Sequence, residues 1–210
     1  MSAMLIHRVR SNPWPPLAGL GAALALLLRL SPTDQTLGQT VKPVYLHGAL
    51  VRTAMILFAL SLPVNLAALL WPQKGWVAWG TALVWGAVAV WLAHTLFSMI
   101  TTYVAWGVPV AWFEPRTRFT FAVAGAGLVF LAVTAFVGHA RFSALAFVIL
   151  GGIVLSLLPR LGIVQHPLDP IGTSSSNAIK GYYAAILIVT LLMGGVLVAW
   201  LKEKLAAGRL

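Results

Sequence analysis

The stretch GYYAAILIVTLLMGGVLVAWL, residues 181–201, contains no charged side chain. An α-helix needs about 20 consecutive apolar residues to cross the hydrocarbon core of a bilayer. Five further runs are also long and apolar enough to span, and no run alternates in polarity as the strands of a membrane β-barrel do. The sequence therefore predicts an all-α, polytopic membrane protein, a bundle of six transmembrane helices forming one domain over residues 1–210. The expected spans are 14–31, 44–71, 76–104, 119–139, 142–159 and 181–201.

The composition agrees with a membrane protein and argues against a nucleic-acid-binding one. The chain is 60% hydrophobic and 9% charged, whereas soluble domains carry about 25% charged residues. Its net charge is +10, but the cations stand singly between apolar runs, as expected for loops and interfaces of a membrane protein. The chain has no cysteine, which excludes disulfides, thiolate metal sites and covalent haem attachment through this chain.

The six spans place both termini on one side of the membrane and the three longer loops, near 32–43, 105–118 and 160–180, on the other. The Lys and Arg residues divide evenly between the two faces. Because the positive-inside rule needs an excess on one face, it does not decide the orientation here. Cations held on a longer-loop face that is exported would favour an anionic ligand at that surface.

Two histidines and two tryptophans fall on this longer-loop face, namely His47, His166, Trp106 and Trp112. Two neutral imidazoles can bind a haem iron, one from each side of the macrocycle. Tryptophan faces suit the flat porphyrin, and arginine forks suit its carboxylates. The alternative is that each histidine is a hydrogen-bonding anchor at the interface. A bound metal ion is a weaker hypothesis, because few acidic side chains lie nearby to supply oxygen ligands.

His94 lies inside the third span, where an ionisable side chain is costly and indicates function. Two interpretations stay open. His94 is either the ligand of a second haem or a hydrogen-bonding partner of a neighbouring Ser or Thr within the bundle.

A family resemblance is carried by the order of several motifs along most of the chain. Residues 12–50, NPWPPLAGLGAALALLLRLSPTDQTLGQTVKPVYLHGAL, hold a Pro-Trp, a first helix, a Gly-Gln turn and a Tyr-x-His entry to the second helix. A Trp-Gly…Trp loop follows at Trp106 and Trp112, and a His-Pro pair at His166 follows the fifth span. In this order the chain resembles the haem-handling membrane proteins of cytochrome c biogenesis, the CcmC/CcsA superfamily, and the CcmC type most closely.

The resemblance implies a haem b bound at the outer face of the membrane. It implies that His47 and His166 are the axial iron ligands, that Trp106 and Trp112 line the haem, and that Arg116 lies near its carboxylates. Arg118 and Arg52 are further candidates for carboxylate contacts. The chain departs from the family motif at Val110 and Phe113, where a tryptophan and an aspartate would fall, and Glu114 lies one place later than the family's acid.

We expect a protein of a bacterial-type inner membrane, with both termini cytoplasmic, that binds haem b and hands it to a haem chaperone for cytochrome c assembly. The alternative is a haem b-containing membrane subunit of a respiratory complex, passing electrons between an exported redox enzyme and a quinone or cytochrome. Binding and transfer are expected in either case rather than bond-making catalysis. A helical anchor that binds no haem is a third possibility.

Overall fold

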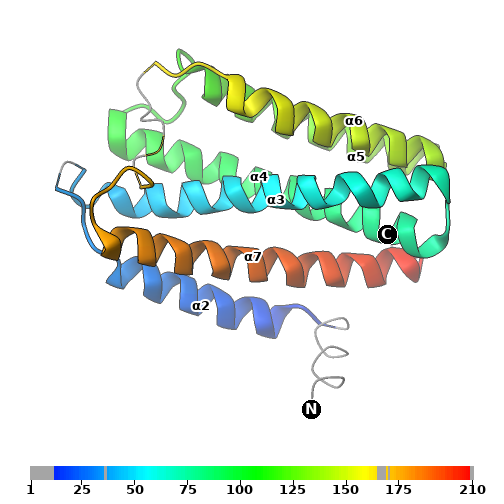
Figure 1. Ribbon diagram of the computed structural model, residues 1–210, viewed down its shortest axis with the longest axis horizontal. Coiled ribbons are helices and arrows are strands. Elements are labelled where there is room, and N and C mark those ends of the chain that lie inside the picture. Colours follow the sequence, from blue (N-terminus) through cyan, green and yellow to red (C-terminus); the bar gives the residue numbers. More distant parts are fainter. Residues whose placement is uncertain (1–11, 36, 165–168, 170, 209–210) are drawn as a thin grey trace.

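The computed structural model describes residues 12–35, 37–164, 169 and 171–208, and within them it is built from helices (Figure 1). An isolated bridge between Asp34 and Gly38 is the only extended pairing in the described chain. The helices are α2 (Trp14–Leu30), α3 (Val41–Leu70), α4 (Lys74–Trp106), α5 (Pro115–Val137), α6 (Ala140–Leu157), the short 3₁₀ helix η1 (Leu158–Arg160) and α7 (Asn177–Ala206).

The predicted class, an all-α polytopic membrane protein, is confirmed. Each predicted span coincides with one helix, and α3 to α7 are long and apolar enough to cross a membrane. The first helix, α2, is apolar but has only 17 residues. At 1.5 Å per residue it is about 26 Å long, slightly shorter than a hydrocarbon core of about 30 Å.

Helix α3 occupies the centre of the bundle and packs on α4, α6 and α7. Helix α5 packs on α4 and α6, and α2 lies on the outside against α7 (Figure 1). The connections 31–40, 107–114 and 161–176, as far as they are described, all lie at one end of the bundle, on the left of Figure 1. We call this the loop end. The turns between α3 and α4 and between α5 and α6 lie at the opposite end, together with the end of α7, whereas the shorter α2 starts near the middle of the bundle.

Several helices extend beyond the predicted spans into polar sequence. Helix α7 begins at Asn177, because the Ser176 hydroxyl accepts the backbone N–H of Ile179 at 3.4 Å and caps the first turn. Helix α5 begins at Pro115, where a proline needs no intrahelical hydrogen bond. The predicted spans include only the apolar residues. The helices themselves continue into the polar interface and end where the backbone leaves the helical conformation.

Helices α3 and α4 form a tight antiparallel hairpin around the turn at 71–73. The buried Asn65 donates from Nδ2 to the carbonyl oxygens of Ser61 at 2.9 Å and Gly80 at 3.2 Å. Helix α4 lies so close to α3 at Gly80 that a Cβ added to this glycine would lie 2.9 Å from Asn65 Cγ. The hairpin thus depends on one buried amide and one position without a side chain.

Candidate functional site

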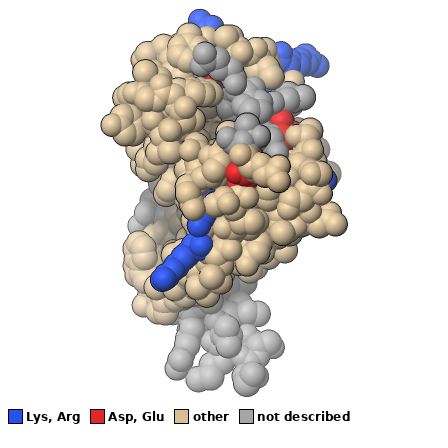
Figure 2. Space-filling model, turned by 90° about the vertical axis from the view of Figure 1, so that its left-hand side faces the viewer, with Lys and Arg blue, Asp and Glu red and all other residues tan. Residues whose placement is uncertain are grey.

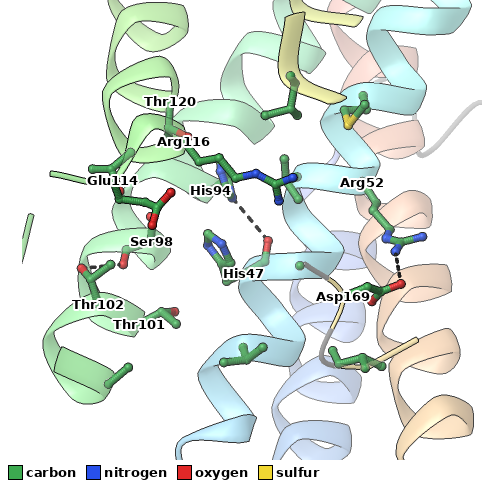
Figure 3. A pocket seen from close by; sticks show the side chains of 18 of the residues that line it. His47, Arg52, His94, Ser98, Thr101, Thr102, Glu114, Arg116, Thr120 and Asp169 are labelled. Carbon is green, nitrogen blue, oxygen red and sulfur yellow. Dashed lines mark hydrogen bonds and ion pairs between the residues drawn. The ribbon is translucent and has the colours of Figure 1, made fainter. Parts of the chain in front are cut away.

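A pocket of about 610 Å³ opens in the half of the bundle nearest the loop end (Figure 3). Its volume lies within the range of about 300–1,000 Å³ usual for small-molecule sites. Its walls come from α3, α4, α5, η1 and α7, and from the connections before α3 and α7. Most of the lining is apolar, and the polar groups that contribute to it are His47, His94, Arg52, Arg116, Glu114, Asp169, Tyr183 and a row of Ser and Thr residues on α4 and α5.

The two histidines lie side by side on one wall of the pocket. The ring centroids of His47 on α3 and His94 on α4 are 4.5 Å apart, with the planes inclined by 32°. His94 is 3% exposed, and its Nδ1 lies 3.3 Å from the main-chain carbonyl oxygen of His47. A carbonyl oxygen only accepts, so this hydrogen bond places the proton on Nδ1 and the lone pair on Nε2. The His94 ring thus donates this hydrogen bond to the backbone of α3.

Trp91 supports His94 from one turn away on α4. The fully buried Trp91 ring meets the His94 ring edge-on at a centroid distance of 5.4 Å. Its indole Nε1–H donates to the Thr120 carbonyl oxygen on α5 at 3.0 Å. His94 is consequently held by α3 and by Trp91, and Trp91 is in turn tied to α5.

The meeting of His47 and His94 was missed from the sequence, although a signal for it exists. The two residues lie at similar sequence distances on either side of the 71–73 turn. In an antiparallel hairpin, positions equidistant from the turn lie opposite each other. His94, for which a second haem or a bond to a neighbouring Ser or Thr was expected, lines the same pocket as His47.

The pair cannot supply both axial ligands of one haem. Metal–nitrogen bonds of about 2 Å on opposite sides of an iron hold the two nitrogens about 4 Å apart, with the ring centres farther out and the macrocycle between them. Rings 4.5 Å apart and nearly parallel leave no such space. The predicted partner of His47, His166, lies outside the described residues.

The two tryptophans of the 105–118 region face different surroundings. Trp106, the last residue of α4, lines the pocket. Trp112 is 57% exposed, lies outside the pocket lining and packs on Phe121 with centroids 5.0 Å apart. The reason is a turn closed by the Glu114 N–H and the Ala111 carbonyl at 3.0 Å, which buries residues 111 and 114 and turns residue 112 outward. The expectation that Trp112 lines a ligand is not met by this geometry.

The three candidate arginines are likewise divided. Arg116 reaches across the pocket from α5, and its Nε is buried without a hydrogen-bond partner among the residues that the structure describes (Figure 3). Arg118 is exposed and lies outside the lining, because a helix turns by about 100° per residue and two residues place it nearly opposite Arg116. Arg52 lines the other side of the pocket.

Arg52 is held by two groups of the α7 side. Its Nη2 lies 3.5 Å from Asp169 Oδ2, and its guanidinium carbon lies 5.7 Å from the centre of the Tyr183 ring. Both charged side chains are about half exposed, so the ion pair itself adds little stability. Asp169 also accepts the Gly172 N–H at 2.9 Å and so closes the turn that leads to α7.

Glu114 is the functional candidate whose role the sequence did not reveal. Its side chain is 1% exposed, and its two carboxylate oxygens lie 3.1 and 3.4 Å from the Val164 amide nitrogen. It thereby ties the start of α5 to the segment that follows α6. The acid that lies one place late for the family motif is thus a buried anchor for that segment.

The α4 wall is rich in hydroxyl groups that bond to their own backbone. Thr101 Oγ1 donates to the Phe97 carbonyl at 2.7 Å, and Thr102 Oγ1 lies 3.0 Å from the Ser98 carbonyl and 2.8 Å from that of Pro109. Both residues line the pocket. Such back-bonding satisfies threonine hydroxyls inside a helix.

Figure 2 looks onto the loop end, where the visible Lys and Arg side chains project at the rim and the visible acidic groups lie nearer the middle. Among the described residues, no three His, Asp or Glu side chains come together as a metal-ion site. The pocket offers imidazole and guanidinium groups in a largely apolar setting. Its two carboxylates already have partners, Glu114 at the Val164 N–H and Asp169 at Arg52 and the Gly172 N–H. This combination suits an apolar anion better than a hydrated cation.

No protein-family model and no curated protein matches this chain.

Proposed function

We propose that this protein binds haem b in the pocket near the loop end and handles it for cytochrome c assembly. The observation that carries the proposal is the convergence of His47, Trp106 and Arg116, from three different helices, on one largely apolar pocket of about 610 Å³. A flat apolar body with two carboxylates matches these groups.

In this proposal His47 is the iron ligand from α3, because its ring is half-buried and projects into the pocket (Figure 3). His94 is a positioning residue, since it lies behind His47 and bonds to its main-chain carbonyl. The family resemblance adds His166 as the second axial ligand. Bound haem would supply an iron that accepts imidazole nitrogen and cycles between two oxidation states.

Arg116 is the proposed carboxylate contact. Its guanidinium lies in the pocket and can form paired hydrogen bonds to a carboxylate. Arg52 is a second cation at the opposite wall, although Asp169 already faces it. Trp106 contributes an aromatic face at the end of α4.

The resemblance further supports a bacterial-type inner membrane, an exported loop end, cytoplasmic termini and a haem chaperone as partner. The second candidate function is a permanent haem b subunit of a respiratory complex. One observation favours it: His94 is fixed by the hydrogen bond to α3 and by the Trp91 ring, an arrangement suited to retaining a ligand.

The direct test is a reduced-minus-oxidised spectrum of protein purified after haem supplementation. We expect a b-type spectrum that is lost in His47→Ala. In His94→Gln we expect the haem to be retained with a shifted Soret maximum or redox potential, because a positioning residue changes the ligand environment without removing the ligand. His139→Asn serves as the control, since His139 caps α6 far from the pocket and asparagine can also accept the Phe142 N–H. Absence of haem from the unmodified protein, or an unchanged spectrum in His47→Ala, would refute the proposal.

Deletion of the gene separates the two functions. Loss of all c-type cytochromes would establish the assembly role. Loss of one respiratory activity, with the c-type cytochromes intact, would establish the electron-transfer subunit instead.

A further inference from the structure

Part of the pocket wall belongs to the stretch of α3 that lies between α6 and α7. Helices α6 and α7 both pack on α3, but within the described chain they make little contact with each other. The strip of α3 between them is visible along the middle of Figure 1. The pocket-lining residues of these elements are Arg52, Met55 and Ile56 on α3, Leu158 and Pro159 on η1, which follows α6, and Leu187 on α7.

The gap reaches the depth of the hydrocarbon core. Ile56 lies about 22 Å from the start of α3, at 1.5 Å per residue, which is the middle of that helix. It lines the pocket and is 39% exposed. One turn farther, Leu60 is 53% exposed on the outer surface and does not line the pocket. A pocket wall that is exposed halfway along a membrane-spanning helix faces lipid.

The limits of the opening are set by two helix contacts. Helix α6 closes on α3 where Gly151 meets Leu62 and the Phe58 carbonyl. Helix α7 is joined to α3 by the hydrogen bond between Thr53 and Thr190, 2.9 Å long. The gap between these contacts is a fixed feature of helix packing.

A cation stands beside the opening. Arg52 lies about 16 Å along α3, where an isolated charge is costly, and it is accompanied by Asp169 and Tyr183. Its side chain is 52% exposed. A molecule that approaches through the bilayer with an acidic edge meets a guanidinium at this point and apolar side chains deeper in the gap.

We infer that the pocket exchanges its ligand with the bilayer through the gap between α6 and α7. The ligand class is a flat, membrane-dissolved molecule with a carboxylate edge. Its identity as haem rests on the proposed function, whereas the side opening rests on the packing of the three helices alone.

The opening is tested without any ligand by photolabelling. An apolar diazirine dissolved in liposomes holding the full-length protein labels the residues that the bilayer interior reaches, and peptide mass spectrometry locates them. We expect labels on Leu60 and also on the pocket-wall residues Val51 and Met55, and none on the buried Ala54. Ile56→Trp should reduce labelling of Val51 and Met55 while Leu60 stays labelled. Labelling of Leu60 without labelling of the pocket wall would overturn the inference.

A second measurement follows haem uptake from haem-loaded liposomes. Ile56→Trp should slow uptake by about tenfold, within the spread of association rates among variants of one site. Leu60→Trp is the matched control, since the same bulk on the next lipid-facing turn lies outside the gap. Equal rates in both variants would overturn the side route. If the unmodified protein takes up no haem at all, the proposed function fails, and the photolabelling still decides the opening.

Discussion

Arg116 and Arg118 lie two residues apart at the start of α5 and have different surroundings. Arg116 enters the pocket with its Nε buried, whereas Arg118 is exposed outside it. The resemblance implies Arg116 as the contact of the haem carboxylates, and Arg118 is a further candidate from the same stretch of sequence. Helical geometry separates them, because side chains two positions apart point to nearly opposite sides.

We therefore predict that Arg116→Gln weakens haem binding and that Arg118→Gln does not. A hydrogen bond to a charged group contributes about 1.5–3 kcal/mol, so the loss corresponds to roughly a 10- to 100-fold rise in Kd. Spectroscopic titration of purified protein with haem measures both constants. Equal Kd values for the two variants would show that Arg116 does not contact the ligand.

Glu114 shows how a buried acid can be structural. Its carboxylate accepts the Val164 N–H, which holds the segment after α6 against the start of α5. Removing this acceptor would leave the Val164 N–H unsatisfied, which lowers the free energy of unfolding by about 1–3 kcal/mol. The effect should be local to the loop end, because this carboxylate lies outside the main core of the bundle.

We predict that Glu114→Ala accelerates amide hydrogen exchange in residues 161–164. Glu114→Gln keeps one side-chain oxygen as an acceptor and should restore much of the protection. Hydrogen exchange read by mass spectrometry on protein in detergent or nanodiscs measures the difference. Protection that is the same in both variants and the parent would contradict the anchoring role.

At the scale of helices, the bundle is held by positions where small residues face a neighbour. Gly127 meets Val88, and Gly194 meets Thr53, while Gly125 and Gly195 have open space around them. Each glycine pair thus contributes one packing position and one open position. The sequence pattern indicates close packing, but it does not tell which member of each pair touches another helix.

The α3–α4 hairpin gives the clearest test of such packing. An added Cβ at Gly80 would collide with the Asn65 side chain, which is buried and bonded to both helices. We predict that Gly80→Ala destabilises the protein by about 1–3 kcal/mol through overpacking. The thermal unfolding midpoint in detergent measures the effect.

Gly75→Ala is the matched control for that variant. Gly75 lies in the first turn of α4, and no atom outside its own helix backbone lies within 4 Å of an added Cβ. Its substitution should leave the midpoint unchanged or raise it slightly, because alanine favours a helix over glycine. A midpoint for Gly80→Ala equal to that of Gly75→Ala would exclude the proposed collision.

At the scale of the whole molecule, the sequence predicts the number, order and approximate position of the helices because apolar runs are the physical requirement for crossing a bilayer. Helix ends such as Asn177 differ because capping and interfacial turns are not apolar. The pocket depends on features that composition does not encode. The register of α3 against α4 places His94 beside His47. The turn at residues 111–114 directs the Trp112 side chain outward.

The orientation of the bundle is a further prediction. If the loop end is exported, Ser175→Cys in the exposed connection before α7 will react with a membrane-impermeant maleimide in intact cells, and Gln73→Cys in the α3–α4 turn will not. The chain has no native cysteine, so both single-cysteine variants are labelled at one site. The reverse pattern would place the loop end in the cytoplasm.

The threonines of α4 have a consequence for how a ligand lies in the pocket. A hydroxyl has one donor proton, and in Thr101 and Thr102 that proton is already directed at a carbonyl of the chain. What these residues present to a guest is their methyl groups and acceptor lone pairs. An anionic edge therefore gains no hydrogen bond from these two threonines, whereas the guanidinium groups of Arg116 and Arg52 can donate to it. A flat ligand with its acidic groups along one edge would therefore lie with that edge turned away from this part of α4.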